Sequence, residues 1–183
     1  MGNRLMALVL DGPKGRLYVI PTKEQADRAL AAHPAWLPEL KLPQNPRDFK
    51  TPNYGIDTYA GLFLNRQAVH LNTLSSLVIE AMNRCRTATN LQPKEQSSSN
   101  EVAPDSGAME YADAVALYLS VAVGKVADYG SANTSWSVSR GQARNTFVRQ
   151  AIPMMWGTAE INPFAGAAGD WAVSLEAVNA FTS

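Results

Sequence analysis

A glycine-rich segment ahead of a helix is the part of this chain best suited to bind a ligand. The segment NPFAGAAG, residues 162–169, leads into an apolar helical pattern that starts at Trp171. Glycine lets the backbone approach a ligand closely, and the N–H groups at a helix N-terminus favour an anionic group. The alternative is a turn between helices plugged by Phe164, because a glycine loop without a preceding strand is a weak signal. The candidate cofactor-binding residues are Asn162, Pro163, Phe164, Gly166 and Gly169.

Five basic residues are candidates for contact with nucleic-acid phosphates. We expect a helix from Ser139 to Ile152, capped by Ser139 and ended by Pro153, and it carries three arginines. Two of them are four residues apart and would share a helix face. Together with two cations from a proline-rich segment they could provide affinity that is independent of base sequence. The alternative is a solvated face with one buried ion pair. The candidates are Arg47, Lys50, Arg140, Arg144 and Arg149.

Side chains for acid–base, nucleophilic or metal chemistry do not form a known pattern. His33 and His70 lie far apart in the sequence and lack the spacing of metal ligands. The single cysteine, Cys85, lies on an apolar stripe, so neither an intrachain disulfide nor a cysteine–histidine zinc set is expected. No serine stands in a Gly-x-Ser-x-Gly motif. We therefore predict no catalytic and no metal-binding residue.

Composition favours one globular domain over residues 1–183. Hydrophobic residues make up 46% of the 183 residues, and 16 basic residues balance 16 acidic ones. A net charge of zero argues against a free-standing non-specific nucleic-acid binder but leaves room for a local basic face. The N-terminus does not resemble a signal peptide, and the longest apolar stretch, Ala114–Val123, is about half of a membrane span. We expect a cytoplasmic protein without membrane contact.

The elements that must position these residues are mainly α-helical, with a small β element at the start. Leu5–Leu10 and Arg16–Ile20 flank the turn DGPKG and predict a β-hairpin. Thr22 with Gln25 predicts a capping box for a helix that Pro34 stops. Five prolines between residues 34 and 52 predict an extended, irregular segment. Its expected side-chain anchors are Trp36, Phe49 and Tyr54.

Three further helices complete a predicted total of about five. Asn65 is the expected N-cap of the first, whose apolar stripe runs from Leu71 to Cys85. Residues 87–107 are polar and serine-rich, which predicts a mobile loop. Residues 108–129 are apolar around most of the helix circumference and predict the central buried helix. Asp170 is the expected cap of a last helix over residues 171–181.

Three blocks of this sequence resemble the large prokaryotic adenine-specific DNA methylases that carry zinc-ribbon-like insertions. The blocks are LPQNPRDFKTPNYGIDTYAGLF, ADAVALYLSVAVGKVADYGS and RNTFVRQAIPMMWGTAEINPFAGAAGDW. In that family a cofactor-binding Asp-Pro-Phe-x-Gly-Gly-Gly loop lies upstream of this region and a catalytic Asp-Pro-Pro-Tyr motif lies downstream. Here Asn162 replaces the acid of the loop, and Thr51-Pro52-Asn53-Tyr54 lacks the carboxylate of the tetrapeptide, so no catalytic role is carried over.

The resemblance implies a middle section of a longer enzyme that transfers a methyl group from S-adenosylmethionine to adenine N6 in DNA. We expect a non-catalytic helical region that shapes the DNA-facing side, with DNA and the flanking methyltransferase segments as partners. S-adenosylmethionine would bind the parent enzyme and not this chain alone. One alternative is a module that braces the catalytic core without touching DNA or cofactor. Another is a complete small enzyme that uses residues 162–169 as its cofactor site.

Overall fold

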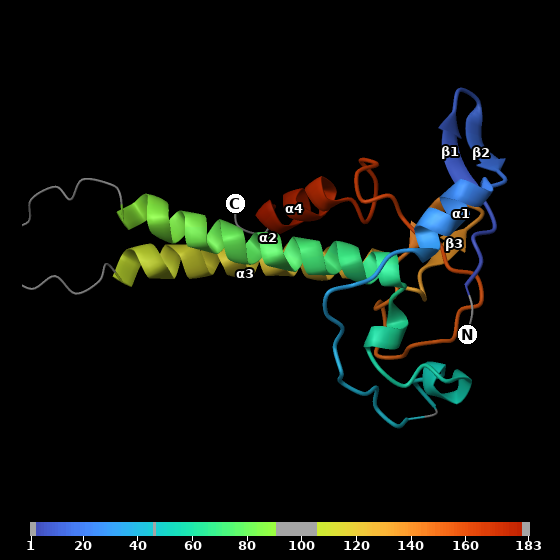
Figure 1. The fold of residues 1–183 in the computed structure, drawn as a ribbon, viewed down its shortest axis with the longest axis horizontal. Helices are drawn as coiled ribbons and strands as arrows, with labels where there is room; N and C mark the ends of the chain where they lie inside the picture. Colours follow the sequence, from blue (N-terminus) through green and yellow to red (C-terminus); the bar gives the residue numbers. More distant parts are fainter. Residues whose placement is uncertain (1–2, 46, 91–105, 181–183) are drawn as a thin grey trace, which may run out of the picture. The chain divides into compact units, whose positions relative to one another are not determined.

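The computed structural model describes residues 3–45, 47–90 and 106–180 (Figure 1). The chain forms two compact units, one of residues 1–70 with 128–160 and the other of residues 71–127 with 161–183. The described residues contain four α-helices and two antiparallel hairpins. The expectation of a mainly helical chain with a small β element therefore holds at this coarse level, whereas the expected fifth helix is absent from the described residues.

The first unit begins with the predicted hairpin. Strands β1 (Leu8–Gly12) and β2 (Gly15–Val19) pair antiparallel, with Leu8 opposite Val19. Gly15 closes the turn at φ 119°, a backbone conformation that residues other than glycine rarely adopt. A local turn signal was enough to specify this element.

The first helix, α1 (Lys23–Leu30), is capped as its sequence predicts. The Thr22 hydroxyl accepts a hydrogen bond from the Gln25 amide at 3.2 Å, and the Gln25 side chain accepts one from the Thr22 amide at 2.9 Å. The helix ends at Leu30, so Pro34 already lies in the irregular segment that follows. The reciprocal cap satisfies two amides that would otherwise lack an intrahelical partner.

The proline-rich segment is irregular as expected, and it surrounds a small apolar core. It contains two short 3-10 turns, η1 (Thr51–Tyr54) and η2 (Ala60–Leu62). Leu42, Leu62 and Ile152 are buried together, with Phe49 and other partly buried side chains around them. Phe49 is therefore an anchor, but Trp36 is 67% exposed and Tyr54 is 45% exposed. Of the three expected anchors, Phe49 is the one that packs against this core.

The helix expected from Ser139 to Ile152 is not formed. Strands β3 (Ser135–Ser137) and β4 (Gln142–Arg144) make an antiparallel hairpin instead, followed by a loop. Gly141, in the hairpin turn, has φ 58°, which interrupts right-handed helical geometry. The backbone amide of Thr146 bonds to the carbonyl of Asp128 at 2.8 Å rather than to a preceding helical turn. Tertiary hydrogen bonds thus override the local capping signals.

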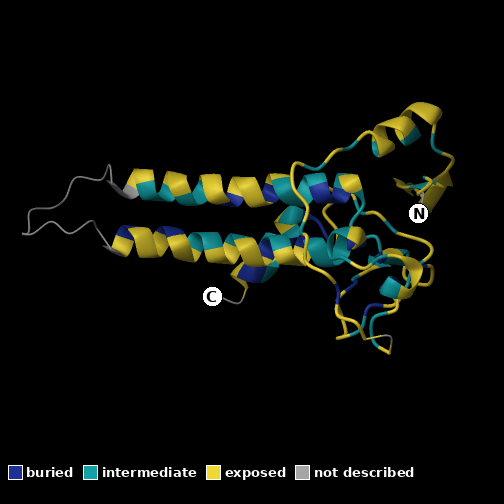
Figure 2. Ribbon diagram, turned by 60° about the horizontal axis from the view of Figure 1, so that its bottom comes forward, coloured by how far each residue is buried: buried dark blue, intermediate teal, exposed yellow. Residues whose placement is uncertain are grey.

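Two long helices, α2 (Asn65–Asn90) and α3 (Ser106–Tyr129), lie side by side and antiparallel (Figures 1 and 2). Most of each helix, from Leu71 in α2 and up to Ala127 in α3, belongs to the second unit. The Arg86 guanidinium bonds to the Asp113 carboxylate across them at 2.6 Å. At the start of α2, the Leu64 amide donates to the Gln67 side chain at 2.8 Å. Leu64 therefore occupies the cap position, one residue before the predicted Asn65.

Helix α3 is amphipathic rather than centrally buried. Ala112 and Ala122 are fully buried and Val126 nearly so, whereas Leu117 is 64% exposed and Val121 is 50% exposed (Figure 2). An apolar sequence all around a helix favours burial, but within its own unit this helix is covered along one stripe only. The expectation of a central buried helix is therefore wrong.

The last helix, α4 (Trp171–Asn179), begins after Asp170 as predicted. Its expected end at residue 181 and most of the loop expected over residues 87–107 lie outside the described residues, although Thr87–Asn90 continue α2. Of the helices in the described part of the chain, none is both long and apolar enough to span a bilayer.

The small core of the first unit predicts a large effect of one truncation. Leu62 is fully buried, and Leu62→Ala should lower the free energy of unfolding by about 2–5 kcal/mol through lost burial and a residual cavity. Leu40→Ala removes the same atoms at a site that is 69% exposed and should change stability by less than about 0.5 kcal/mol. Urea titration of both variants measures the difference, and equal losses would contradict this core.

Candidate functional site

The two basic segments are joined by a backbone pairing that their separation in the sequence does not reveal. Phe49 and Ile152 form a parallel bridge. The Lys50 amide donates to the Ile152 carbonyl and the Ile152 amide donates to the Asp48 carbonyl, both at 2.9 Å. Asp48–Lys50 and Ile152 therefore pair in the parallel direction. Arg47 and Lys50 flank this bridge on one segment, Arg149 lies three residues before it on the other, and all three residues are exposed.

Asn45 shapes the first of these segments. Its side-chain oxygen accepts a hydrogen bond from the Arg47 amide at 3.1 Å, and its side-chain nitrogen donates to the Asp48 carboxylate at 2.7 Å. Its carbonyl also accepts a bond from the Phe49 amide at 2.8 Å. The resulting turn buries Phe49 against the core and leaves Arg47 on the surface.

The other two candidate cations lie in the second hairpin. Arg140 is in the exposed turn, and Arg144 is on β4 opposite Ser135. The Arg144 guanidinium donates to the Ser137 hydroxyl at 3.3 Å. Because the segment is a hairpin, these two arginines do not share a helix face as the sequence suggested. All five candidate cations are nevertheless exposed residues of the first unit.

The chain after α3 is held by the carboxylate and carbonyl of Asp128. The carboxylate accepts from the Phe147 amide at 2.6 Å and from the Asn145 side chain at 3.0 Å. The Asp128 carbonyl accepts from the Thr146 amide at 2.8 Å. Three consecutive residues of the returning chain are thus tied to the end of one helix.

A cluster of buried hydroxyls completes this attachment. The Thr146 hydroxyl lies 2.6 Å from that of Ser131 and 3.1 Å from that of Thr134. The Thr134 hydroxyl donates to the Tyr129 carbonyl at 2.9 Å. Ser131 and Thr134 are fully buried, and a buried hydroxyl is tolerated only when it is hydrogen-bonded. We refer to Asp128, Ser131, Thr134 and Thr146 as the polar knot.

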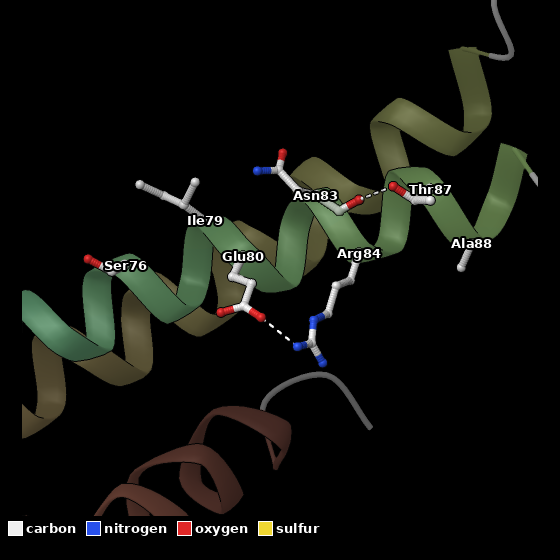
Figure 3. A pocket seen from close by; sticks show the side chains of 7 residues that line it. All are labelled: Ser76, Ile79, Glu80, Asn83, Arg84, Thr87 and Ala88. Atoms are coloured by element: carbon white, nitrogen blue, oxygen red, sulfur yellow. Dashed lines mark hydrogen bonds and ion pairs between the residues drawn. The ribbon is translucent and has the colours of Figure 1, made fainter.

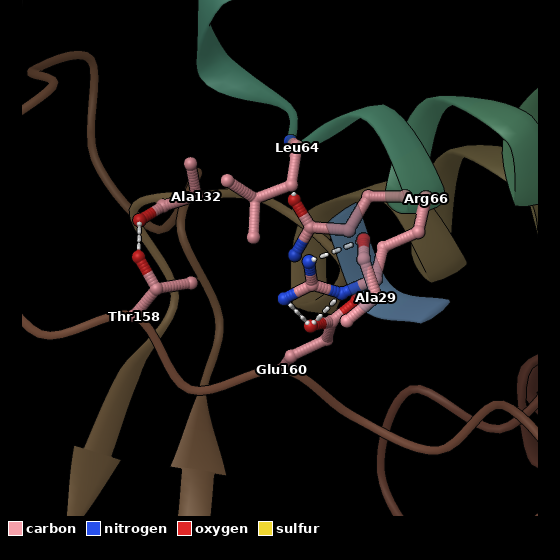
Figure 4. Close-up of polar contacts among 7 residues, drawn as sticks. Ala29, Leu64, Arg66, Ala132, Thr158 and Glu160 are labelled. Carbon is pink, nitrogen blue, oxygen red and sulfur yellow. Dashed lines mark hydrogen bonds and ion pairs between the residues drawn. The ribbon is translucent and has the colours of Figure 1, made fainter. Parts of the chain in front are cut away.

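The end of the returning chain is fixed by a second set of contacts (Figure 4). The Thr158 hydroxyl donates to the Ala132 carbonyl at 2.5 Å. The Arg66 guanidinium pairs with Glu160 and also donates to the Ala29 carbonyl at 3.2 Å. Both charged side chains are less than one third exposed. Residues 145–160 are therefore attached at both ends, with the arginine-bearing loop between.

An exposed aromatic pair lies beyond the parallel bridge. The ring centroids of Tyr54 and Trp156 are 5.2 Å apart and the ring planes are at 80°, which is an edge-to-face contact. Trp156 is 71% exposed. Trp156 was not among the site residues predicted from the sequence. The available signal was a tryptophan within a stretch, residues 139–156, that has three arginines and no acidic residue.

The glycine loop of the second unit is organised around Asp170. The Asp170 carboxylate accepts hydrogen bonds from the amide of Gly166 at 2.8 Å, of Ala172 at 2.7 Å and of Val173 at 3.4 Å. The Asp170 amide itself donates to the Ala167 carbonyl. Gly166 and Gly169 have φ values of 65° and 90°, so both turns need glycine. The loop closes on a carboxylate of its own chain.

This arrangement does not fit the binding of S-adenosylmethionine. The amides that would face an anionic ligand at the start of α4 already bond to Asp170, and no strand precedes the loop among the described residues. Asn162 accepts from the Phe164 amide at 3.1 Å and Pro163 accepts from the Trp171 amide at 3.1 Å, so both stabilise the turn. Phe164 is 79% exposed and is not the plug that the alternative interpretation required.

His33 is exposed, and partial burial lowers the pKa of the His70 imidazole on α2. No group of three or more histidine, cysteine, aspartate or glutamate side chains that could hold a metal ion occurs in the described part of the chain. An open depression lies along α2 and includes Ile79 and the Glu80–Arg84 ion pair, but none of the candidate residues (Figure 3).

Comparison with known proteins adds no relative: no family model, curated protein or solved structure matches this chain.

The Asp170 cap predicts a pH-dependent contribution to stability. Hydrogen bonds, chiefly from the Gly166 amide, lower the pKa of Asp170 below its ordinary value of 3.8. A lowered folded-state pKa stabilises the fold above pH 4, and this contribution is lost as the pH falls through the folded-state pKa. Asp170→Asn should therefore be less stable than the unmodified chain at pH 6, and the difference should shrink below pH 4.

Thermal unfolding at a series of pH values measures this difference. Glu176→Gln, at an exposed site on α4, is the control and should follow the unmodified chain at every pH. A difference for Asp170→Asn that stays constant from pH 6 to pH 3 would show that the carboxylate is not held in this way.

Proposed function

We propose that this chain is a non-catalytic part of an adenine-N6 DNA methyltransferase and that its first unit lies against the DNA backbone. The observation that supports the proposal is the Phe49–Ile152 bridge, which joins the segment that carries the exposed Arg47 and Lys50 to the segment that follows the exposed Arg149. Phosphate contacts of this kind position a protein on DNA without reading its sequence. The family resemblance supplies the reaction and the nucleic acid.

The neutral net charge is compatible with this role because acidic and basic residues are unevenly distributed along the chain. Glu160, the first acidic residue after Arg149, forms an ion pair with Arg66. Residues 139–156 add three positive charges and no negative one. A locally positive surface can therefore exist on a chain whose total charge is zero.

The proposal assigns the methyl transfer to other segments of the parent enzyme. S-adenosylmethionine would bind there, since the loop at residues 162–169 is closed by Asp170. The catalytic carboxylate is likewise expected elsewhere, because Thr51–Tyr54 forms a 3-10 turn that carries none. What this chain supplies is a rigid, positively charged surface near the substrate.

A second candidate function is a brace between the segments of the parent enzyme. It is favoured by the exposed apolar side chains of α3, among them Leu117 and Val121. Exposed apolar patches of this kind mark contact surfaces for other protein segments. A pure brace would contact neither DNA nor cofactor, which makes the two functions separable by experiment.

The test is a gel-shift titration of the 183-residue chain with duplex DNA at several salt concentrations. Each phosphate contact should contribute about 0.9 to the slope of log affinity against log salt. Replacing Arg47, Lys50 and Arg149 together by glutamine should lower the magnitude of that slope by up to about three times this amount, because three phosphate contacts would be lost. The expected loss of affinity should be the same for unrelated duplex sequences.

Two arginines that lie in exposed helical ion pairs provide matched controls. Arg28→Gln in the first unit and Arg84→Gln in the second remove the same charge and should leave the salt slope unchanged. A slope near zero for the unmodified chain would reject the DNA-facing role and favour the brace. Equal effects of control and test substitutions would show that the gathered cations are not the contact surface.

A further inference from the structure

We propose that Tyr54 and Trp156 form a stacking platform for unpaired nucleotides of a DNA strand, beside the cations that contact its phosphates. This inference rests on the proposed function and names the form of DNA that the surface takes. It concerns nucleotides outside the reaction centre, because the proposed function assigns the methyl transfer to other segments of the parent enzyme. The support comes from the order of residues along two paired segments.

The bridge joins two segments that share an order of residue types, with a cation before the bridged residue and an aromatic ring after it. On both segments a basic residue precedes the bridge, Arg47 on one and Arg149 on the other. On both segments an aromatic residue follows it, and these two rings touch. A strand lying along this direction would meet phosphate-binding groups first and ring surfaces next.

Lys50 lies between the two ends of this surface. It immediately precedes η1, whose last residue is Tyr54. A 3-10 helix rises about 2.0 Å per residue, so the Lys50 and Tyr54 backbones are separated by roughly 8 Å along the axis. This spans about two nucleotides at the 3.4 Å spacing of stacked bases. An exposed lysine at this distance suits a phosphate about two nucleotides from a stacked base.

The ring geometry leaves stacking surface available. In an edge-to-face pair only one ring uses a face for the contact, so the partner ring keeps both of its faces outside the pair. Trp156 is 71% exposed, which leaves room for a base. Bases in a duplex are already stacked on their neighbours, whereas every unpaired base has a free π-face. The platform therefore favours single-stranded over duplex DNA.

The charge of the surroundings favours nucleic acid over a protein partner. An exposed aromatic pair alone would suit either. Here residues 139–156 contain three arginines and no acid, and an exposed lysine precedes η1. Cations interleaved with exposed rings are the combination by which single-strand-binding surfaces hold backbone and base together.

The experiment measures affinities of the 183-residue chain for a labelled single-stranded DNA, its duplex, and a single-stranded RNA of the same sequence. Trp156→Ala should weaken single-stranded DNA binding about 5- to 100-fold, as expected for the loss of one stacked base. Trp156→Phe keeps a ring and should retain most of the affinity. Trp36→Ala, at a tryptophan with similar exposure, is the control and should bind like the unmodified chain. Far-UV circular dichroism confirms that each variant is folded.

The outcomes separate this inference from the proposed function. The platform is rejected if Trp156→Ala weakens the binding of single-stranded and duplex DNA equally, or if it weakens the binding of neither. In that case salt-dependent binding of duplex DNA would still support the DNA-facing role. Tighter binding of RNA than of DNA would reject the assignment to DNA. Absence of binding to any of the three nucleic acids would reject both. Selective loss of single-stranded DNA binding, with recovery in Trp156→Phe, supports the platform.

Discussion

The first unit depends on how the chain is held as it leaves α3. The Asp128 carboxylate and carbonyl accept bonds from three successive residues of the returning chain, Asn145 to Phe147. The buried hydroxyls of Ser131, Thr134 and Thr146 bond to one another beneath them. Buried polar networks specify one arrangement strongly, because each broken bond leaves an unsatisfied group in a low-dielectric interior. The polar knot thus replaces a larger apolar core in this unit.

This attachment determines where the basic surface lies. Residues 148–151 connect Thr146 and Phe147, which bond to Asp128, to the Phe49–Ile152 bridge. The contact of Thr158 with Ala132 and the ion pair of Arg66 with Glu160 fix the other end. A loop attached at both ends loses little conformational entropy when its side chains bind a ligand. On this account, rigidity allows a small number of cations and one aromatic pair to act as a defined surface.

The sequence was most informative where structure is local. The Thr22 cap, the first hairpin and the Asp170 cap all rest on residues within a few positions of each other. The helix expected after Ser139 does not form, because a glycine turn and tertiary hydrogen bonds to Asp128 outweigh the local capping signals in the sequence. The exposure of α3 was missed because an apolar pattern does not reveal how much of a helix is covered.

For the candidate site, residue types were predictable but adjacency was not. Arg47, Lys50 and Arg149 could be selected from their charge alone. That their two segments meet depends on the Phe49–Ile152 bridge, which joins residues far apart in the sequence. Hydrogen exchange in Asp128→Ala tests whether the knot controls that surface, with Asp57→Ala as an exposed control. We expect the amides of Thr146 and Phe147 to lose protection together with those of Lys50 and Ile152. The account would be contradicted if the amides of Thr146 and Phe147 lost protection from exchange while those of Lys50 and Ile152 kept theirs.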